Sequence, residues 1–216
     1  MKKILVIGTG GLAREFTSWF AASLEIVGYF STSPSEHSQF NLPGALHQDR
    51  VTPEIAGTDL AVIAIGAPAV KAAMYLKFEQ LGFKFPTIVH PSSVVAATAQ
   101  LQEGVVICPH CVVSASATLQ KMVYVNFGCG IGHDSVIGNF VQINPGSQLG
   151  GASTIGEFTL IGSGSTILQG VIVGPSATIG SGSVVFAKVA PGSAVMGNPA
   201  RRMRAFEASP GPGNTP

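Results

Sequence analysis

The sequence predicts two units of different fold class: an α/β unit over residues 1–90 and an all-β unit, a parallel β-helix, over residues 91–203. Up to about residue 90, short apolar runs alternate with segments of helix length. Beyond it the helical signal is lost, and an aliphatic residue recurs at every sixth position. Only 11% of the residues are charged, less than half the usual ~25%, which favours an architecture that spaces its charges thinly.

The first ninety residues show the alternation typical of a small parallel sheet with helices on its faces. Apolar runs predict strands, and longer segments between them predict helices. The strands are expected at residues 4–7, 26–30 and 60–65, and the helices at residues 12–22 and 69–81. The segment 31–49 is polar, and its sequence predicts no order of elements.

The repeat in the second unit has a period of six. The sixteen positions from Val95 to Val185 in steps of six are all aliphatic, and the positions from Ala99 to Val189 in the same steps carry small residues. Neither a strand period of two nor a helix period of 3.6 keeps a face in register every six residues. Three blocks of strand and corner can close one turn of a parallel β-helix, so sixteen blocks make about five turns. The period alone does not fix the handedness.

Residues eighteen apart stack on neighbouring turns, and one such column carries a candidate catalytic group. It runs Ala115, His133, Gly151, Gln169. An imidazole above a glycine faces an open groove, where it can act as the base that removes a proton from an attacking amine or hydroxyl. Asp134 can fix the imidazole tautomer, and the Gly151 N–H can stabilise a thioester oxyanion. The arrangement suits acyl transfer; the alternative is a histidine on a solvated corner.

Three segments carry a resemblance to a known family. These are NFGCGIGHDSVIG at residues 126–138, the pair Gly150-Gly151, and GNPARRM at residues 197–203. They resemble the bacterial sugar acetyltransferases of the PglD and NeuD type over residues 2–203. That family joins a Rossmann-like domain to a left-handed β-helix and forms homotrimers. It transfers acetyl from acetyl-CoA to nucleotide-linked 4-amino-4,6-dideoxy sugars or, in the NeuD branch, to a sialic acid hydroxyl.

The resemblance implies an N-acetyltransferase with a small Rossmann-like N-terminal domain and a left-handed parallel β-helix. By position, His133 matches the general base, Asp134 the acid that follows it, and Asn126 a residue near the acceptor sugar. Gly151 matches the glycine whose amide faces the thioester carbonyl. Acetyl-CoA is expected to bind at Gly150, Gly151, Gly162, Gly170 and Arg201.

The glycine-rich turn near the start supports two interpretations. Gly8-x-Gly10-x-x-Ala13 follows a strand and opens a helix, as a dinucleotide-binding turn does. NAD binding also requires an acid at the end of the second strand, where this chain has Ser31 and Thr32. The family uses this turn for the sugar nucleotide instead. Its site is expected at Gly8, Gly10, Gly11, Ser31, Thr32, Gly66 and Ala67, with Asn126 near the sugar.

Three residues depart from the family pattern. Leu12 stands where a histidine is usual, Ser31 and Thr32 stand where an acidic pair is usual, and Gln142 stands where a second histidine often lies near the acetyl donor. These departures leave the nucleotide open. They also keep two alternatives in view: O-acetylation of a sialic acid or related sugar, and an inactive trimeric sugar-nucleotide-binding protein.

Composition argues against several other classes. A formal net charge of +1 offers no electrostatic footprint for nucleic acid, and the apolar runs are too short for membrane insertion. Three cysteines suit a reducing cytoplasm. The Cys108-Pro109-His110-Cys111 motif is not expected to be redox-active, and the spacing of His90, His110 and His133 does not predict a metal site. Residues 204–216 are expected to form a disordered tail.

Overall fold

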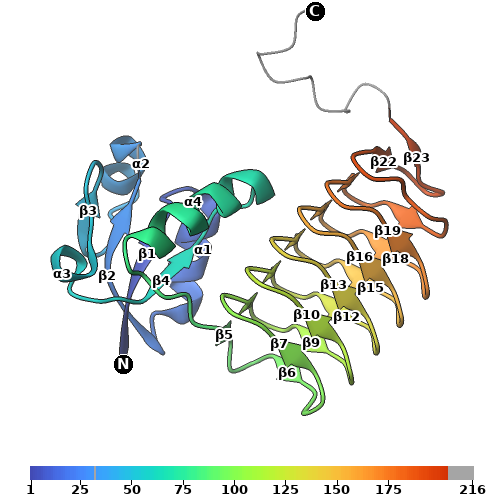
Figure 1. Ribbon diagram of the computed structural model, residues 1–216, viewed down its shortest axis with the longest axis horizontal. Helices are drawn as coiled ribbons and strands as arrows, with labels where there is room; N and C mark the ends of the chain where they lie inside the picture. The colour runs from blue at the N-terminus through green and yellow to red at the C-terminus, as the bar shows by residue number, and fades with distance from the viewer. Residues whose placement is uncertain (32, 204–216) are drawn as a thin grey trace, which may run out of the picture.

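The computed structural model describes residues 1–31 and 33–203 (Figure 1). The predicted tail at residues 204–216 and the predicted site residue Thr32 lie outside the described residues. A sheet flanked by helices is followed along the chain by a long prism of short strands (Figure 1), as the two patterns in the sequence predict.

The N-terminal sheet is parallel, with strand order β3-β2-β1-β4. Its strands are β1 (Lys2–Ile7), β2 (Leu24–Phe30), β3 (Ala45–His47) and β4 (Ala61–Ile63). Alternate residues of β1 face opposite sides, because successive side chains of a strand point in opposite directions. Ile4 and Val6 pack in the same cluster as Phe16 of helix α1 (Gly11–Phe20). Leu5 and Ile7 pack with Phe78 of helix α4 (Pro68–Gln80).

The polar segment whose order the sequence did not predict contains two elements. Helix α2 (Pro34–Gln39) and strand β3 both form there, and helix α3 (Pro53–Ala56) follows. Both short helices begin at a proline, whose fixed φ suits the first helical position. Thr52 caps α3 by accepting from the Ile55 N–H at 3.5 Å. These elements are too short to carry a readable hydrophobic period.

The prism repeats a two-residue strand and a corner, and over residues 88–203 its strands stack into three faces. The β5 face consists of β5 (Ile88–Val89), β8 (Val106–Ile107), β11 (Tyr124–Val125), β14 (Gln142–Ile143), β17 (Leu160–Ile161), β20 (Thr178–Ile179), β22 (Ala194–Met196) and the antiparallel β23 (Arg201–Arg202). The β6 face consists of β6 (Val94–Val95), β9 (Val112–Val113), β12 (Gly130–Ile131), β15 (Gln148–Leu149), β18 (Thr166–Ile167) and β21 (Val184–Val185). The β7 face consists of β7 (Gln100–Leu101), β10 (Thr118–Leu119), β13 (Val136–Ile137), β16 (Thr154–Ile155) and β19 (Ile172–Val173).

The register confirms the predicted stacking of residues eighteen apart, since Tyr124 pairs with Gln142 and Gly130 with Gln148. The aliphatic column fills the interior, in which Ile143 and Ile161 are completely buried. Polar members of the small column are buried with it, and they donate to corner carbonyls or, in the pair Ser135 and Ser153, contact each other. Ser147 Oγ, for example, donates to Gly162 O at 2.9 Å. The buried hydroxyls are therefore satisfied inside the prism.

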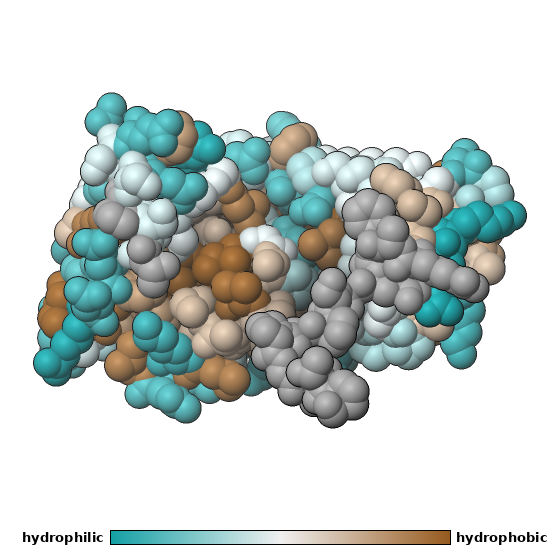
Figure 2. All heavy atoms as spheres, turned by 90° about the horizontal axis from the view of Figure 1, so that it is seen from above, coloured by the Kyte–Doolittle hydropathy of each residue, from teal (hydrophilic) through white to brown (hydrophobic). Residues whose placement is uncertain are grey.

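The α/β part packs against the first turns of the β5 face. Phe16 and Phe20 of α1 share a buried cluster with Val106 and Tyr124 of that face. From above, hydrophobic surface gathers over the α/β part toward its junction with the prism (Figure 2). This packing holds the glycine-rich turn and the prism in one molecule, and it places α4 over β11 and β14.

Candidate active site

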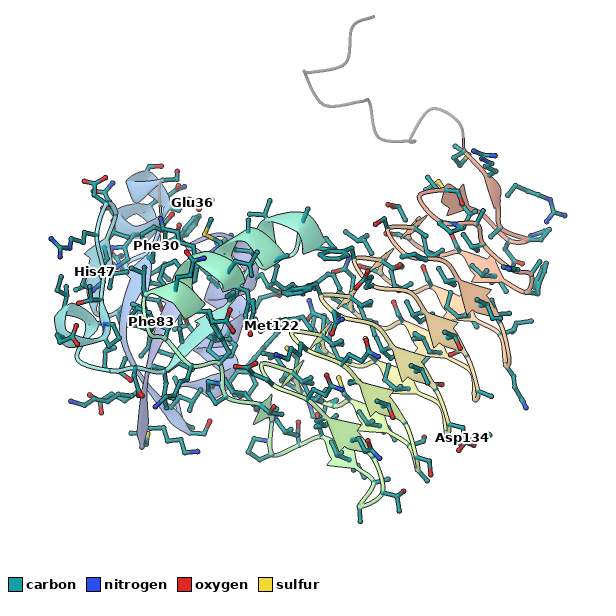
Figure 3. The ribbon with its side chains drawn as sticks, viewed as in Figure 1. Phe30, Glu36, His47, Phe83, Met122 and Asp134 are labelled. Atoms are coloured by element: carbon teal, nitrogen blue, oxygen red, sulfur yellow. The ribbon has the colours of Figure 1, made fainter. Side chains whose placement is uncertain are left out.

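His133 and Asp134 form the corner between β12 and β13. The Nδ1 atom of His133 lies 2.7 Å from Oδ2 of Asp134, and both side chains are more than half exposed. Asp134 has a φ of +58°, in the left-handed region that aspartate tolerates better than most residues. Figure 3 shows Asp134 at an outer edge of the prism, pointing away from it.

The imidazole of His133 lies against Gly151 on the next turn. A Cβ atom at residue 151 would overlap Nε2, Cε1 and Cδ2 of the ring, so this position of the ring requires glycine. The Ala152 N–H also donates to His133 O at 2.7 Å. Because the Asp134 carboxylate only accepts, it places the ring proton of neutral His133 on Nδ1 and leaves a lone pair on Nε2. The corner therefore presents a base.

Two other predicted coenzyme residues lie at the same corner. Gly150 directly precedes Gly151, and the Gly170 N–H donates to Gly151 O at 2.9 Å. Gly170 has open space where a Cβ would be. Among the described residues, none accepts a hydrogen bond from the Gly151 N–H. The stacking argument thus brings a base, a carboxylate and a free amide donor together.

Gly162 and Arg201 lie elsewhere on the prism. Gly162 lines a cavity of about 220 Å³ at a different corner, together with Asn144, Leu160 and Ile179. Arg201 lies on β23 near the C-terminal end of the prism, where its Nη1 donates to Ala200 O at 3.1 Å. Gly162 and Gly151 therefore lie at different corners of this chain, so the single chain does not bring all the predicted coenzyme residues together.

Asn126 follows β11 and is 4% exposed. Its Oδ1 accepts a hydrogen bond from the Phe127 N–H at 2.8 Å, so this oxygen stabilises the backbone of its own corner. It lies on a different corner of the same turn from His133. A role for Asn126 near the acceptor remains a prediction.

The predicted nucleotide residues that the structure describes in the α/β part lie at the carboxyl edge of the sheet. Gly8 has a φ of +116°, and a Cβ there would contact the Ala64 carbonyl. Helix α1 begins at Gly11, and Gly10 before it has no side chain to cap the free N–H groups of the first turn. Gly66 and Ala67 lead from β4 into α4. This edge is where open α/β sheets bind ligands.

An acid that sequence reasoning missed lies beside this turn. Thr9 Oγ1 lies 3.0 Å from Glu36 Oε2 and 2.8 Å from Ser31 Oγ, and the Ser33 N–H also donates to Ser31 Oγ. The Glu36 carboxylate oxygens lie within about 4 Å of the place where Gly10 would carry a Cβ. Figure 3 labels Glu36 on α2. The chain has no acid at the end of β2, but α2 places a carboxylate beside it, and the signal was a proline that starts a helix two residues before Glu36.

A second group that sequence reasoning missed is Lys71 of α4, which is 1% exposed. Its Nζ donates to Gln142 Oε1 at 3.1 Å and to the main-chain oxygens of Met122 and Val141. Burial lowers the pKa of Lys71 to about 7, because desolvation disfavours the charged form. Gln142, the departure from the family pattern, is therefore a buried partner of this lysine.

The cysteine motif separates into two environments. Cys108 belongs to the cluster under α1, whereas Cys111 points into the prism. Burial raises the pKa of the Cys108 thiol, which disfavours a reactive thiolate. Within residues 1–31 and 33–203, no three His, Cys, Asp or Glu side chains lie together as metal ligands would. No helix in the same ranges is long and apolar enough to span a membrane.

Comparison with known proteins identifies the repeat. The bacterial transferase hexapeptide (six repeats) family model matches residues 152–187. No curated protein matches the sequence.

Several solved structures match over nearly the whole length. PerB from Caulobacter crescentus, in complex with CoA and GDP-perosamine, is 24% identical with a TM-score of 0.83, covering 94% of this chain and 98% of that chain. The acetyltransferase domain of PglB from Neisseria gonorrhoeae FA1090, in complex with acetyl coenzyme A, is 27% identical with a TM-score of 0.82, covering 94% and 99%. WeeI from Acinetobacter baumannii AYE is 22% identical with a TM-score of 0.74, covering 94% and 100%.

The hexapeptide repeat, the two-part architecture and the full-length neighbours together support an acyltransferase that is similar to those of the hexapeptide-repeat superfamily. Within that superfamily the chain is similar to the bacterial sugar N-acetyltransferases, which confirms the resemblance seen in the sequence. The same neighbours confirm the predicted Rossmann-like domain and left-handed β-helix.

Proposed function

We propose that the chain transfers acetyl from acetyl-CoA to the amino group of a nucleotide-linked 4-amino-4,6-dideoxy sugar, with His133 as general base. The observation that carries this proposal is the corner itself: an imidazole whose Nδ1 is held by Asp134 and whose ring lies against Gly151. PerB supports the substrate class, because its structure contains CoA and GDP-perosamine.

The chemistry follows from the contact of His133 Nδ1 with Asp134, which leaves Nε2 to act on the substrate. The sugar amine attacks the thioester carbonyl, and Nε2 of His133 takes the proton that the nitrogen sheds. The thioester oxygen becomes negative in the tetrahedral intermediate, and the free Gly151 N–H is the nearest candidate donor to it. When the intermediate collapses, the carbon–sulfur bond breaks and the protonated His133 returns the proton to the leaving thiolate. Asp134 stabilises the imidazolium during this interval.

The acceptor's nucleotide is proposed to bind at the glycine-rich turn. Free N–H groups at the start of α1 favour a pyrophosphate near Gly10 and Gly11, with Gly66 and Ala67 across the edge of the sheet. The Glu36 carboxylate lies beside Gly10 and would repel a phosphate placed against it, so the pyrophosphate is proposed to lie on the Gly11 side of the turn. It is better suited to accept hydrogen bonds from ribose hydroxyls or from base N–H groups.

We further propose that the active form is a homotrimer. In the single chain the side chains of His133 and Asp134 are both more than half exposed, whereas proton transfer and charge stabilisation work best where water is excluded. Apolar residues also lie exposed on the prism, such as Val94 and Val112 on the β6 face. A neighbouring prism packed on this face would cover them. The buried free thiols fit a reducing cytoplasm.

The direct test is a thiol-release assay with acetyl-CoA and a panel of UDP-, dTDP- and GDP-linked 4-amino sugars, with the product identified by mass spectrometry. We expect acetyl transfer to the amine of at least one member. Acetylation of free sialic acid while every amine fails would overturn the proposal in favour of O-acetylation. Binding of a sugar nucleotide without any thiol release would instead indicate a binding protein.

A further inference from the structure

A polar chain crosses the junction between α4 and the β5 face. Lys71 Nζ donates to Met122 O at 3.3 Å, to Val141 O at 3.4 Å and to Gln142 Oε1 at 3.1 Å. Gln142 Nε2 donates in turn to Asn144 Oδ1 at 3.2 Å. Lys71 and Gln142 are each 1% exposed, so this series of hydrogen bonds is shielded from water as far as Asn144.

Lys71 determines the orientation of both carboxamides, because its side chain is the donor in this chain. The Gln142 atom that it meets must be the carbonyl oxygen, which leaves the Gln142 NH₂ group facing Asn144. Asn144 must then turn its own carbonyl oxygen toward Gln142. Its NH₂ group is left over, and no residue within the described part of the chain accepts a hydrogen bond from it.

Asn144 lines the cavity of about 220 Å³ on the β5 face. Most of the lining is apolar, including Leu160, Ile179 and Val195. Gly162 and Gly180 carry no side chains that would fill the space beside them. Such a cavity suits a narrow, mostly apolar ligand segment that carries isolated amide groups, provided that a hydrogen-bond donor of the protein meets the amide carbonyl oxygen.

We propose that Lys71 and Gln142 are positioning residues that hold the Asn144 carboxamide with its N–H group toward this cavity, where it donates to an amide carbonyl of the pantetheine arm of acetyl-CoA. This inference rests on the proposed function, since it takes acetyl-CoA as the ligand. It assigns a use to Gln142, which departs from the family pattern, and to a buried lysine that the acyl-transfer steps do not employ.

Two variants reverse the polarity of the group that faces the cavity. In Gln142→Glu, one carboxylate oxygen still accepts from Lys71, but the other accepts from Asn144 and forces its carboxamide to turn over. In Asn144→Asp, an oxygen acceptor replaces the NH₂ group directly. Gln100→Glu adds the same charge at an exposed position on the β7 face and serves as the control.

The measurements are the Kd for CoA by calorimetry, and kcat and KM for acetyl-CoA. We expect Gln142→Glu and Asn144→Asp to raise Kd and KM about tenfold, equivalent to about 1.4 kcal/mol, with kcat changed less than about twofold. Gln100→Glu should match the wild type. A purely structural role for Lys71 and Gln142 predicts no such split, because Gln142→Glu keeps the lysine paired.

Two results would count against the inference, and they are distinguishable. Equal CoA affinity in the wild type, Gln142→Glu and Asn144→Asp would overturn the positioning role and leave the proposed function intact. Failure of the wild type to bind CoA at millimolar concentration would overturn the proposed function, and this inference with it.

Discussion

The imidazole of His133 packs on a residue that has no side chain. Its position depends on two neighbours of different kinds: Asp134, which holds Nδ1, and Gly151, which leaves room for the ring. An isolated surface contact between such exposed groups contributes little to stability. The arrangement therefore contributes to the geometry of the base rather than to the stability of the fold.

Gly151→Ala tests that geometry. The added methyl group overlaps the ring of His133 and must displace it, so we expect kcat to fall by about 10–100-fold, since misplacement by about 1 Å costs up to 10²-fold. The melting temperature should change little, because the ring is exposed and can move.

The matched control is a double-mutant cycle with His133→Ala. If the alanine at residue 151 acts only by displacing the imidazole, it costs nothing further once the imidazole is gone. If Gly151→Ala lowers kcat in the His133→Ala background as much as it does in the wild type, Gly151 acts independently of His133.

Sequence reasoning found some of these residues and missed others for a physical reason. His133, Asp134 and Gly151 were found because a strict period makes spatial neighbours calculable from residue numbers. Glu36 and Lys71 belong to the α/β part, which has no such period. Their places depend on how a short helix and the domain junction pack, and a single sequence does not contain that information.

At the scale of elements, the prism strands are only two residues long, apart from β22 with three, and each depends on its stacked neighbours. Ile143 of β14 is completely buried among aliphatic residues from neighbouring turns, such as Ile161. We expect Ile143→Asp to prevent folding, because it places an unpaired charge in an apolar interior at a cost of several kcal/mol. Circular dichroism and thermal melting would show this loss.

The control is Thr154→Asp, on an exposed position of β16. It introduces the same side chain on the outer surface and should fold. A cooperative melt of Ile143→Asp near the wild-type temperature would contradict the account of the core.

Lys71 of α4 gives the stability a pH dependence. Its pKa is about 7 in the folded chain against an ordinary value of 10.5, so above pH 7 the unfolded chain binds more protons and stability rises with pH. We expect the difference in unfolding free energy between the wild type and Lys71→Met to grow in favour of the wild type between pH 7 and 8.5. The slope should approach about 1.4 kcal/mol per pH unit. Urea melts across that range would measure it, and parallel curves would contradict it.

At the scale of the whole molecule, the two sequence patterns predicted the two parts and the stacking of the prism. The period could be recognised in the sequence because every turn requires the same residue types: an aliphatic residue inside and a small one near the corner. The elements within the segment 31–49 could not be predicted from the sequence. Helix α2 and strand β3 are short, and they are stabilised by packing against β2 and the glycine-rich turn. Tertiary contacts, not local propensity, order such elements.

The proposed trimer is a property of the whole molecule. Sedimentation at micromolar concentration should show a single species of three chains. Association would bury the exposed apolar residues of the prism and shield the exposed corner at His133 from water. Val112→Glu, which charges an exposed position of the β6 face, tests whether that face takes part. A wild-type protein that stays monomeric and yet turns over at full rate would contradict the proposal.

The most direct test of the central claim compares acetyl transfer by the wild type and by His133→Ala, with acetyl-CoA binding measured on the same samples. If His133 is the base, kcat falls by about 10²–10⁴-fold, while the Kd for acetyl-CoA stays within about twofold because the base acts in the transition state. A variant that keeps more than half of the wild-type rate when chemistry limits turnover would show that the corner is not the catalytic site.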